Sequence, residues 1–148
     1  MKIILSTLLL AFAVVSTQSH AAPEIIPLHR DAVKNESLDE IPPYPDDEIL
    51  RGEHKNWVKV VHQGEVTIAI YESTPVLIDI RDPFPYDEFV LVLEGEITLT
   101  HIDGKQDSFK AGDSFMVPKG FIGTWDMTKH FREMVVVETK AMMEAEGM

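Results

Sequence analysis

The chain has 148 residues, of which 45% are hydrophobic, and it carries a formal net charge of −12 and no cysteine. This length fits one domain, and the hydrophobic content is too high for global disorder. An acidic chain without a basic patch is a poor partner for nucleic acid or anionic lipid. The absence of cysteine excludes disulfides, thiol catalysis and zinc–thiolate sites.

Residues 1–21 have the pattern of a secretory signal peptide. Lys2 supplies the positive charge, residues 3–15 are almost entirely apolar, and Ser19 and Ala21 are the small residues expected before a cut after Ala21. A membrane anchor is the disfavoured alternative, because the apolar run is shorter than the ~20 residues that span a bilayer. We therefore expect a periplasmic or secreted protein with no membrane contact after cleavage.

Residues 22–55 are predicted to form an extended, acidic, proline-rich arm. The five prolines of this segment oppose helix formation, and the sequence IPPYP at residues 41–45 favours extended or polyproline geometry. Acidic residues flank these prolines and favour contact with solvent. Two arrangements remain open: the arm wraps the barrel or a second subunit, or it is a disordered leader.

Residues 56–148 are predicted to form a single all-β domain. Turn sequences, including the hairpin signal Asp103-Gly104, separate about eight short strands, a pattern typical of a sandwich or barrel. A jelly roll would protect the strand edges. The strand at residues 89–93 is apolar on both faces and should be buried on both sides. Residues 140–146 are expected to form one or two helical turns.

Two segments resemble motifs of the cupin superfamily. EFVLVLEG at residues 88–95 is similar to the second half of the first cupin motif, and GDSFMVPKG at residues 112–120 is similar to the start of the second. The wider pattern over residues 57–138 resembles the cupin subgroup that includes ureidoglycine aminohydrolase-like domains. The resemblance implies a small cupin jelly-roll β-barrel.

The resemblance also implies where a metal would bind. In metal-binding cupins the first motif supplies two histidines and a glutamate, and the second supplies a third histidine; here these positions fall on Asp82, Phe84, Glu88 and Gly123. Only Glu88 matches the family's ligand, although Asp82 offers an oxygen. A transition-metal site usually needs three or four protein ligands with imidazole among them. We therefore expect no cofactor and no metal held in the usual cupin fashion, with a divalent metal as the less favoured alternative.

The five histidines that follow the predicted signal peptide are not expected to form a substitute metal site. None pairs as HxH or HxxH, and each is expected to be a surface or hydrogen-bonded side chain rather than a ligand. They are His29, His54, His62, His101 and His130.

Glu88 is the candidate catalytic residue. Side chains two apart on a strand share a face, so Phe84 and Tyr86 should point into the barrel with Glu88. A carboxylate in an apolar barrel has a raised pKa unless something pairs with it, and it can act as a general acid or base or hold the amine or hydroxyl of a ligand. The alternative is a structural Glu88 bonded to Tyr86, Tyr71 or Trp125.

Five further side chains are candidates for ligand binding: Tyr71, Asp82, Phe84, Tyr86 and Trp125. Trp125 would stack on a planar or sugar-like ligand, or it belongs to the core. Asp82 is expected beside Arg81 at the pocket entrance, unless the two simply pair with each other or with solvent.

Three functions remain open from the sequence. The favoured one is binding of a small polar organic molecule inside the barrel. The resemblance implies the second, an enzyme that acts on a C–N bond of a ureide-like compound or an isomerase in which Glu88 transfers a proton. The third is a non-catalytic interaction domain, which a barrel filled by its own side chains would favour. The face of Phe89, Leu91 and Leu93 needs cover, from the arm or from a second subunit in a homodimer.

Overall fold

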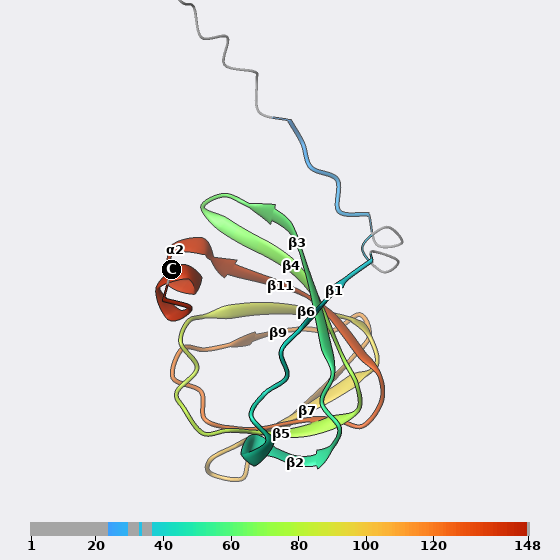
Figure 1. Cartoon of the computed structure of the whole chain (residues 1–148), viewed down its shortest axis with the longest axis vertical. Helices are drawn as coiled ribbons and strands as arrows, with labels where there is room; N and C mark the ends of the chain where they lie inside the picture. Colours follow the sequence, from blue (N-terminus) through green and yellow to red (C-terminus); the bar gives the residue numbers. More distant parts are fainter. Residues whose placement is uncertain (1–23, 30–32, 34–36, 148) are drawn as a thin grey trace, which may run out of the picture.

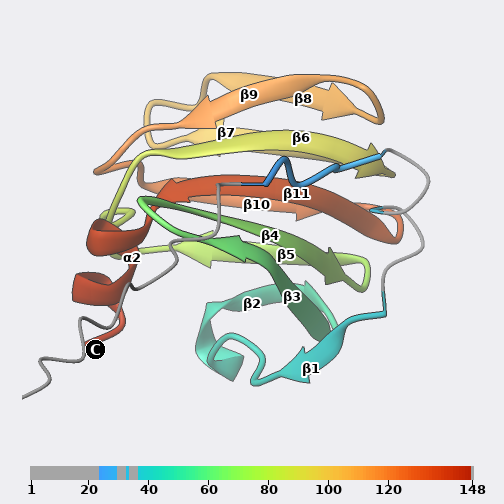
Figure 2. The same ribbon diagram turned by 90° about the horizontal axis from the view of Figure 1, so that it is seen from above.

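The computed structural model describes residues 24–29, 33 and 37–147. In this part of the chain, eleven strands form two antiparallel sheets that face each other around the barrel interior (Figures 1 and 2). This arrangement confirms the predicted all-β jelly roll. No described helix is long and apolar enough to cross a membrane. The predicted signal peptide, residues 1–21, lies outside the described residues.

The six-stranded sheet has the order β1-β3-β4-β11-β6-β9. Its strands are β1 (Asp39–Ile41), β3 (Asn56–Gln63), β4 (Val66–Ser73), β6 (Glu88–Glu94), β9 (Ser114–Val117) and β11 (Phe131–Glu138). The pairing register places Glu88 of β6 opposite Val137 of β11, and Glu133 of β11 opposite Tyr71 of β4. Because successive side chains alternate between the faces of a strand, this register decides which residues share the barrel interior.

The five-stranded sheet has the order β2-β5-β10-β7-β8. Its strands are β2 (Ile49–Gly52), β5 (Val76–Ile80), β7 (Glu96–His101), β8 (Gln106–Lys110) and β10 (Gly123–Met127). The tight turn between β6 and β7 depends on Gly95, whose φ is +80° and where a Cβ would come within 2.3 Å of the His130 carbonyl oxygen. Only glycine fits this turn without strain.

The core lies between the two sheets. Ile78 of β5 and Phe131 of β11 are fully buried, and Val90 and Met127 are each 1% exposed. Their alternation with polar or half-buried neighbours along the strands is the pattern expected of sheets with one face on the core.

The second half of the predicted arm is part of the barrel. Strand β1 pairs with β3, the 3-10 helix η1 (Asp46–Glu48) follows, and β2 pairs with β5, so residues 39–52 add a strand to an edge of each sheet. Extended backbone at a sheet edge tolerates the prolines around these strands. Of the two arrangements considered, the structure therefore shows this half of the arm wrapping its own barrel.

Strand β6 is not buried evenly on both sides. Leu93 is buried against Val33 and Ile70, whereas Phe89, at the other end of the same outward face, is 36% exposed. Val33 is held there by its carbonyl oxygen, which accepts a hydrogen bond from Arg132 Nη2 at 3.0 Å. The prediction of burial on both sides is therefore confirmed at Leu93 and wrong at Phe89.

The chain after β11 forms the helix α2 (Thr139–Ala145), close to the predicted helical turns at 140–146. Figures 1 and 2 show α2 at one end of the barrel, next to the end of β11. Met142 of this helix and Glu146, the residue after it, line the cavity described below. This helix therefore forms one border of the barrel mouth.

Candidate functional site

A cavity of about 550 Å³ lies inside the barrel between the sheets. Its polar and aromatic lining comes from the arm, β3, β4, β6 with its preceding loop, β10, β11 and the residue after α2. Six of these residues are Tyr44, Tyr71, Tyr86, Glu88, Trp125 and Glu133. A cavity of this size, mostly apolar and with a few convergent polar groups, is the usual form of a small-molecule site.

The structure brings most of the predicted site residues together. Tyr71, Phe84, Tyr86, Glu88 and Trp125 all line the cavity.

Asp82 and Arg81 lie apart from this group. Asp82 is exposed and does not line the cavity. Arg81 pairs with Asp47 at 2.8 Å and with Asp79 at 2.9 Å rather than with Asp82. The predicted ligand contact of Asp82 thus stays a prediction without support from its position.

Glu88 is placed at the start of β6, between Val137 of β11 and Val117 of β9. Its side chain is 8% exposed, and burial raises its pKa to about 7. Within the described residues it makes no hydrogen bond or ion pair, so the alternative of a tie to Tyr86, Tyr71 or Trp125 is not supported. A carboxyl group with a pKa near neutrality can both release and accept a proton at physiological pH.

Glu133 is a second buried carboxyl that the sequence analysis missed. It lies on β11, opposite Tyr71 of β4 and Val92 of β6, and is 5% exposed. Burial raises its pKa well above the ordinary value, and the charge of Glu88 raises it further. The sequence could have revealed it through the two-residue alternation of strand side chains. Glu133 is two and four residues before Val135 and Val137, which face inward, so it should face inward with them.

A hydrogen-bonded histidine orients the Tyr71 hydroxyl. The Tyr44 backbone N–H donates to His54 Nδ1 at 3.0 Å, and His54 Nε2 lies 3.2 Å from the Tyr71 hydroxyl oxygen. Burial lowers the pKa of His54 and so favours the neutral ring. Because Nδ1 accepts, the ring proton sits on Nε2 and is donated to Tyr71. The Tyr71 hydroxyl is therefore left to donate its own proton.

Aromatic rings form one wall of the cavity. Phe84 lies 5.4 Å from Tyr86 in an edge-on contact and 5.4 Å from Trp125 in a tilted one, measured between ring centroids. Trp125 is half-buried, and its Nε1 is buried without a hydrogen-bond partner among the described residues. Burial, followed by the charge of Glu88, raises the pKa of Tyr86 to about 12, so Tyr86 stays protonated and neutral. Trp125 is thus both a core contact of Phe84 and part of the cavity wall.

The donor set does not fit the metal of other cupins. Gly123, at the position of the third histidine, has no room for a side chain, because a Cβ there would come within 2.0 Å of the Thr100 carbonyl oxygen. Phe84 has no donor atom and Asp82 is outside the cavity. Across residues 24–29, 33 and 37–147, no three His, Cys, Asp or Glu side chains are grouped to hold a metal ion. We derive no chemistry through a metal at this site.

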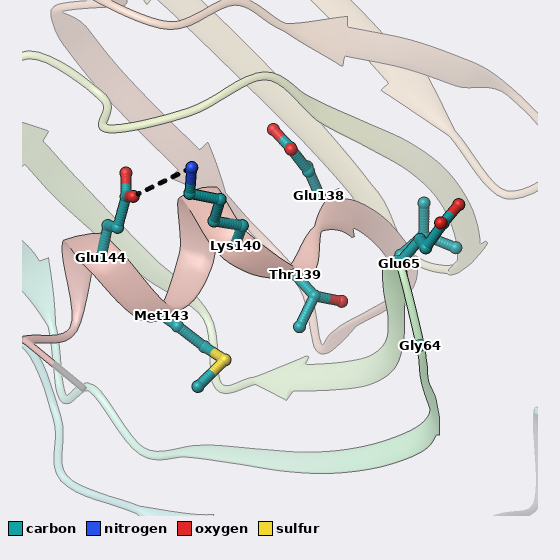
Figure 3. Close-up of a pocket in the computed structure, with 8 residues that line it drawn as sticks. Gly64, Glu65, Glu138, Thr139, Lys140, Met143 and Glu144 are labelled. Atoms are coloured by element: carbon teal, nitrogen blue, oxygen red, sulfur yellow. Dashed lines mark ion pairs between the residues drawn. The ribbon is translucent and has the colours of Figure 1, made fainter.

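A second hollow lies between α2 and the turn that joins β3 to β4 (Figure 3). Its side chains are at the surface, and its one lysine, Lys140, lies 3.8 Å from Glu144 on the same helix. None of the side chains that line it is buried, whereas the barrel cavity holds two buried carboxyls. The barrel cavity is therefore the candidate site.

Solved structures similar to this chain share its fold. A protein of unknown function from Pseudomonas syringae has a TM-score of 0.64 at 20% identity, covering 70% of this chain and 45% of its own. A putative ethanolamine utilization protein EutQ from Salmonella typhimurium gives 0.51 at 22% identity, covering 58% and 71%. The polyketide cyclase RemF from Streptomyces resistomycificus gives 0.56 at 15% identity, covering 78% and 80%.

The chain spans less than half of the Pseudomonas syringae protein. Because all three sequence identities are low, these similarities show a shared fold and nothing about function. No curated protein matches the chain. The finer resemblance to ureidoglycine aminohydrolase-like domains finds no support in these comparisons.

A sequence model of the EutQ-like cupin domain matches residues 61–134, which is half of the 148 residues. The matched segment runs from β3 to β11 and contains both buried carboxyls. This match agrees with the jelly roll and with the two cupin-like motifs around Gly95 and Gly112. The chain belongs to the EutQ-like cupin family.

Proposed function

We propose that this protein binds a small organic ligand inside its barrel, without a metal held in the usual cupin fashion. The observation that carries the proposal is Glu88, a carboxyl that is 8% exposed, lines the cavity and has no partner among the described residues. Burying such a group without a partner is costly, and a donor group of a ligand would offset that cost. A cavity of about 550 Å³ is also the opposite of the filled barrel that would favour a pure interaction domain.

Metal-independent acid–base catalysis is the second candidate. It is favoured by the pKa of Glu88, about 7, since a general acid or base works best when its pKa lies near the working pH. An isomerase-type proton transfer fits this arrangement better than cleavage of a ureide C–N bond, because the related aminohydrolase chemistry resembles a manganese reaction and the donor set here does not fit a metal. Deuterium uptake from D₂O into a bound ligand, followed by NMR, would support this candidate.

We further propose that the protein is exported, on the pattern of residues 1–21. The expected mature chain begins at Ala22. N-terminal sequencing of the protein recovered from periplasm or medium tests this; an intact Met1 in the exported fraction would contradict it.

The test of ligand binding is a thermal-shift screen of the purified protein against a library of small acids, amines, alcohols and sugars. We expect at least one chemical class to raise the melting temperature, because a ligand that binds the folded state stabilises it. Glu88→Gln should then weaken binding by about tenfold or more, since the carboxylate is lost.

The matched control is Glu94→Gln, at the exposed end of the same strand, which should bind as the wild type does. A library without a single hit, or equal affinity in Glu88→Gln, would overturn the proposed role. Elemental analysis of protein purified without chelators completes the test, and a stoichiometric transition metal would contradict the metal-free part of the proposal.

A further inference from the structure

The charge balance of the cavity is one-sided. Glu88, Glu133 and Glu146 line it, and no lysine, arginine or histidine side chain does so in the described part of the chain. Glu88 and Glu133 are 8% and 5% exposed. Neither makes a hydrogen bond or an ion pair with a described residue. Two unpartnered carboxyls in one apolar cavity are costly when ionised, and a positive charge placed between them would offset the cost of both.

The rest of the lining suits the same kind of ligand. Tyr71, Tyr86 and Trp125 present aromatic rings to the cavity, and ring faces attract cations within about 6 Å of their centroids. The nearby titratable groups supply no competing positive charge: Tyr44 and Tyr86 stay neutral with pKa values raised to about 12. Glu146, after α2, adds negative charge at the mouth.

We infer that the ligand of this barrel is a small organic ammonium ion, with its charged nitrogen against Glu88 and Glu133 and its apolar part against the aromatic wall. This inference rests on the proposed ligand-binding function and adds the chemical class of the ligand. The lining favours a cation over an anion, because an anion of the same size would meet buried acidic groups and no cationic side chain among the described residues.

Proton linkage follows from the same arrangement. Without a ligand, the raised pKa values of Glu88 and Glu133 keep this pair partly protonated near neutral pH. An ammonium ion favours the ionised pair, so binding releases protons and becomes tighter as pH rises through about 7. Tyr44, Tyr71 and Tyr86 do not titrate in this range, since burial raises the pKa of each above its ordinary value.

The experiment compares three probes of one shape by isothermal titration calorimetry at about pH 8: 2-phenylethylammonium, the neutral 2-phenylethanol and the anionic phenylacetate. We expect the ammonium ion to bind at least about tenfold more tightly than either of the others. Lowering the pH to about 5.5 should weaken its binding by about tenfold or more, while the probe itself remains charged.

Glu133→Gln should weaken binding of the ammonium probe by about tenfold or more. Glu138→Gln, at the exposed end of the same strand, should leave the affinity unchanged. If Glu133→Gln does not fold, the pH dependence of the wild type decides the question alone. Equal or tighter binding of the alcohol or the carboxylate, pH-independent binding, or no binding of the ammonium probe would overturn the inference. Ligand binding as such would still stand if the library screen gave a hit of another class.

Discussion

The two sheets of the barrel present different inner faces to the same interior. The five-stranded sheet contributes buried apolar side chains, among them Ile78, Leu99 and Met127. The six-stranded sheet mixes buried Val90 with the carboxyls Glu88 and Glu133 and the hydroxyl of Tyr71. The comparison teaches that one sheet mainly supplies packing energy, whereas the other gives up part of that energy to present polar groups.

The largest effect is expected from breaking the apolar face. Ile78→Ala removes a fully buried side chain between β2 and β10 and should lower the free energy of unfolding by about 4 kcal/mol. Ile102→Ala, at a position that is 81% exposed, is the control and should change it by less than about 0.5 kcal/mol. Urea denaturation measures both. A loss below about 1 kcal/mol for Ile78→Ala would mean that this face is not the main source of packing energy.

The second effect is the pH dependence of stability, which measures the cost of burying a carboxyl on the six-stranded sheet. The pKa of Glu88 is about 7 in the folded protein and 4.5 ordinarily, so the folded state holds this proton more tightly than the unfolded state. Ionised Glu88 therefore destabilises the fold: the penalty is absent below about pH 4.5, grows as pH rises, and is complete above about pH 7. A shift of this size corresponds to about 3 kcal/mol. The free energy of unfolding should fall by about that amount across this range.

Glu88→Gln should remove this part of the pH dependence, while Glu94→Gln on the same strand should retain it. Some slope will remain in Glu88→Gln, because Glu133 also has a raised pKa. Urea denaturation at pH steps across the range gives the comparison. If wild type and Glu88→Gln differ by a constant amount at every pH, Glu88 does not titrate as a buried acid.

Most of the fold was predictable because most strands show an apolar or alternating sequence pattern, and clear turn sequences separate them. The predicted strand at 89–93 corresponds to β6, and the hairpin signal Asp103-Gly104 lies between β7 and β8. Three strands were missed. β1 and β2 lie among prolines and charges and are strands because β3 and β5 offer them edges to pair with. β10 begins at Gly123, and its sequence GTWDM lacks the alternation that marks a strand.

The alternation of side chains along strands made part of the candidate site predictable. Counting in twos from Glu88 led to Phe84 and Tyr86, and both line the cavity. Glu133 follows the same rule from Val135 and Val137, but a charged residue near the start of a strand is ordinarily exposed. Tyr44 and His54 lie in the predicted arm, and their place at the site depends on how that arm docks. Such long-range docking leaves no local pattern in the sequence.

The smallest effect separates a hydrogen-bonded tyrosine of the cavity, Tyr71 of β4, from one without a recognised partner among the described residues, Tyr86 in the loop before β6. Tyr71→Phe removes the oxygen that accepts the proton of His54 Nε2 and leaves that buried donor unpaired, at a cost of about 1 kcal/mol. Tyr86→Phe is the matched control and should cost less than about 0.5 kcal/mol, since the Tyr86 hydroxyl makes no hydrogen bond with a described residue. Chemical denaturation gives both values, and ¹⁵N NMR of His54 should show the proton on Nε2 in wild type and both variants. Equal losses would mean that ring packing, not the hydrogen bond, holds Tyr71. A loss confined to Tyr71→Phe would mean that the hydrogen bond with His54 stabilises the fold, whereas the Tyr86 hydroxyl contributes little to stability.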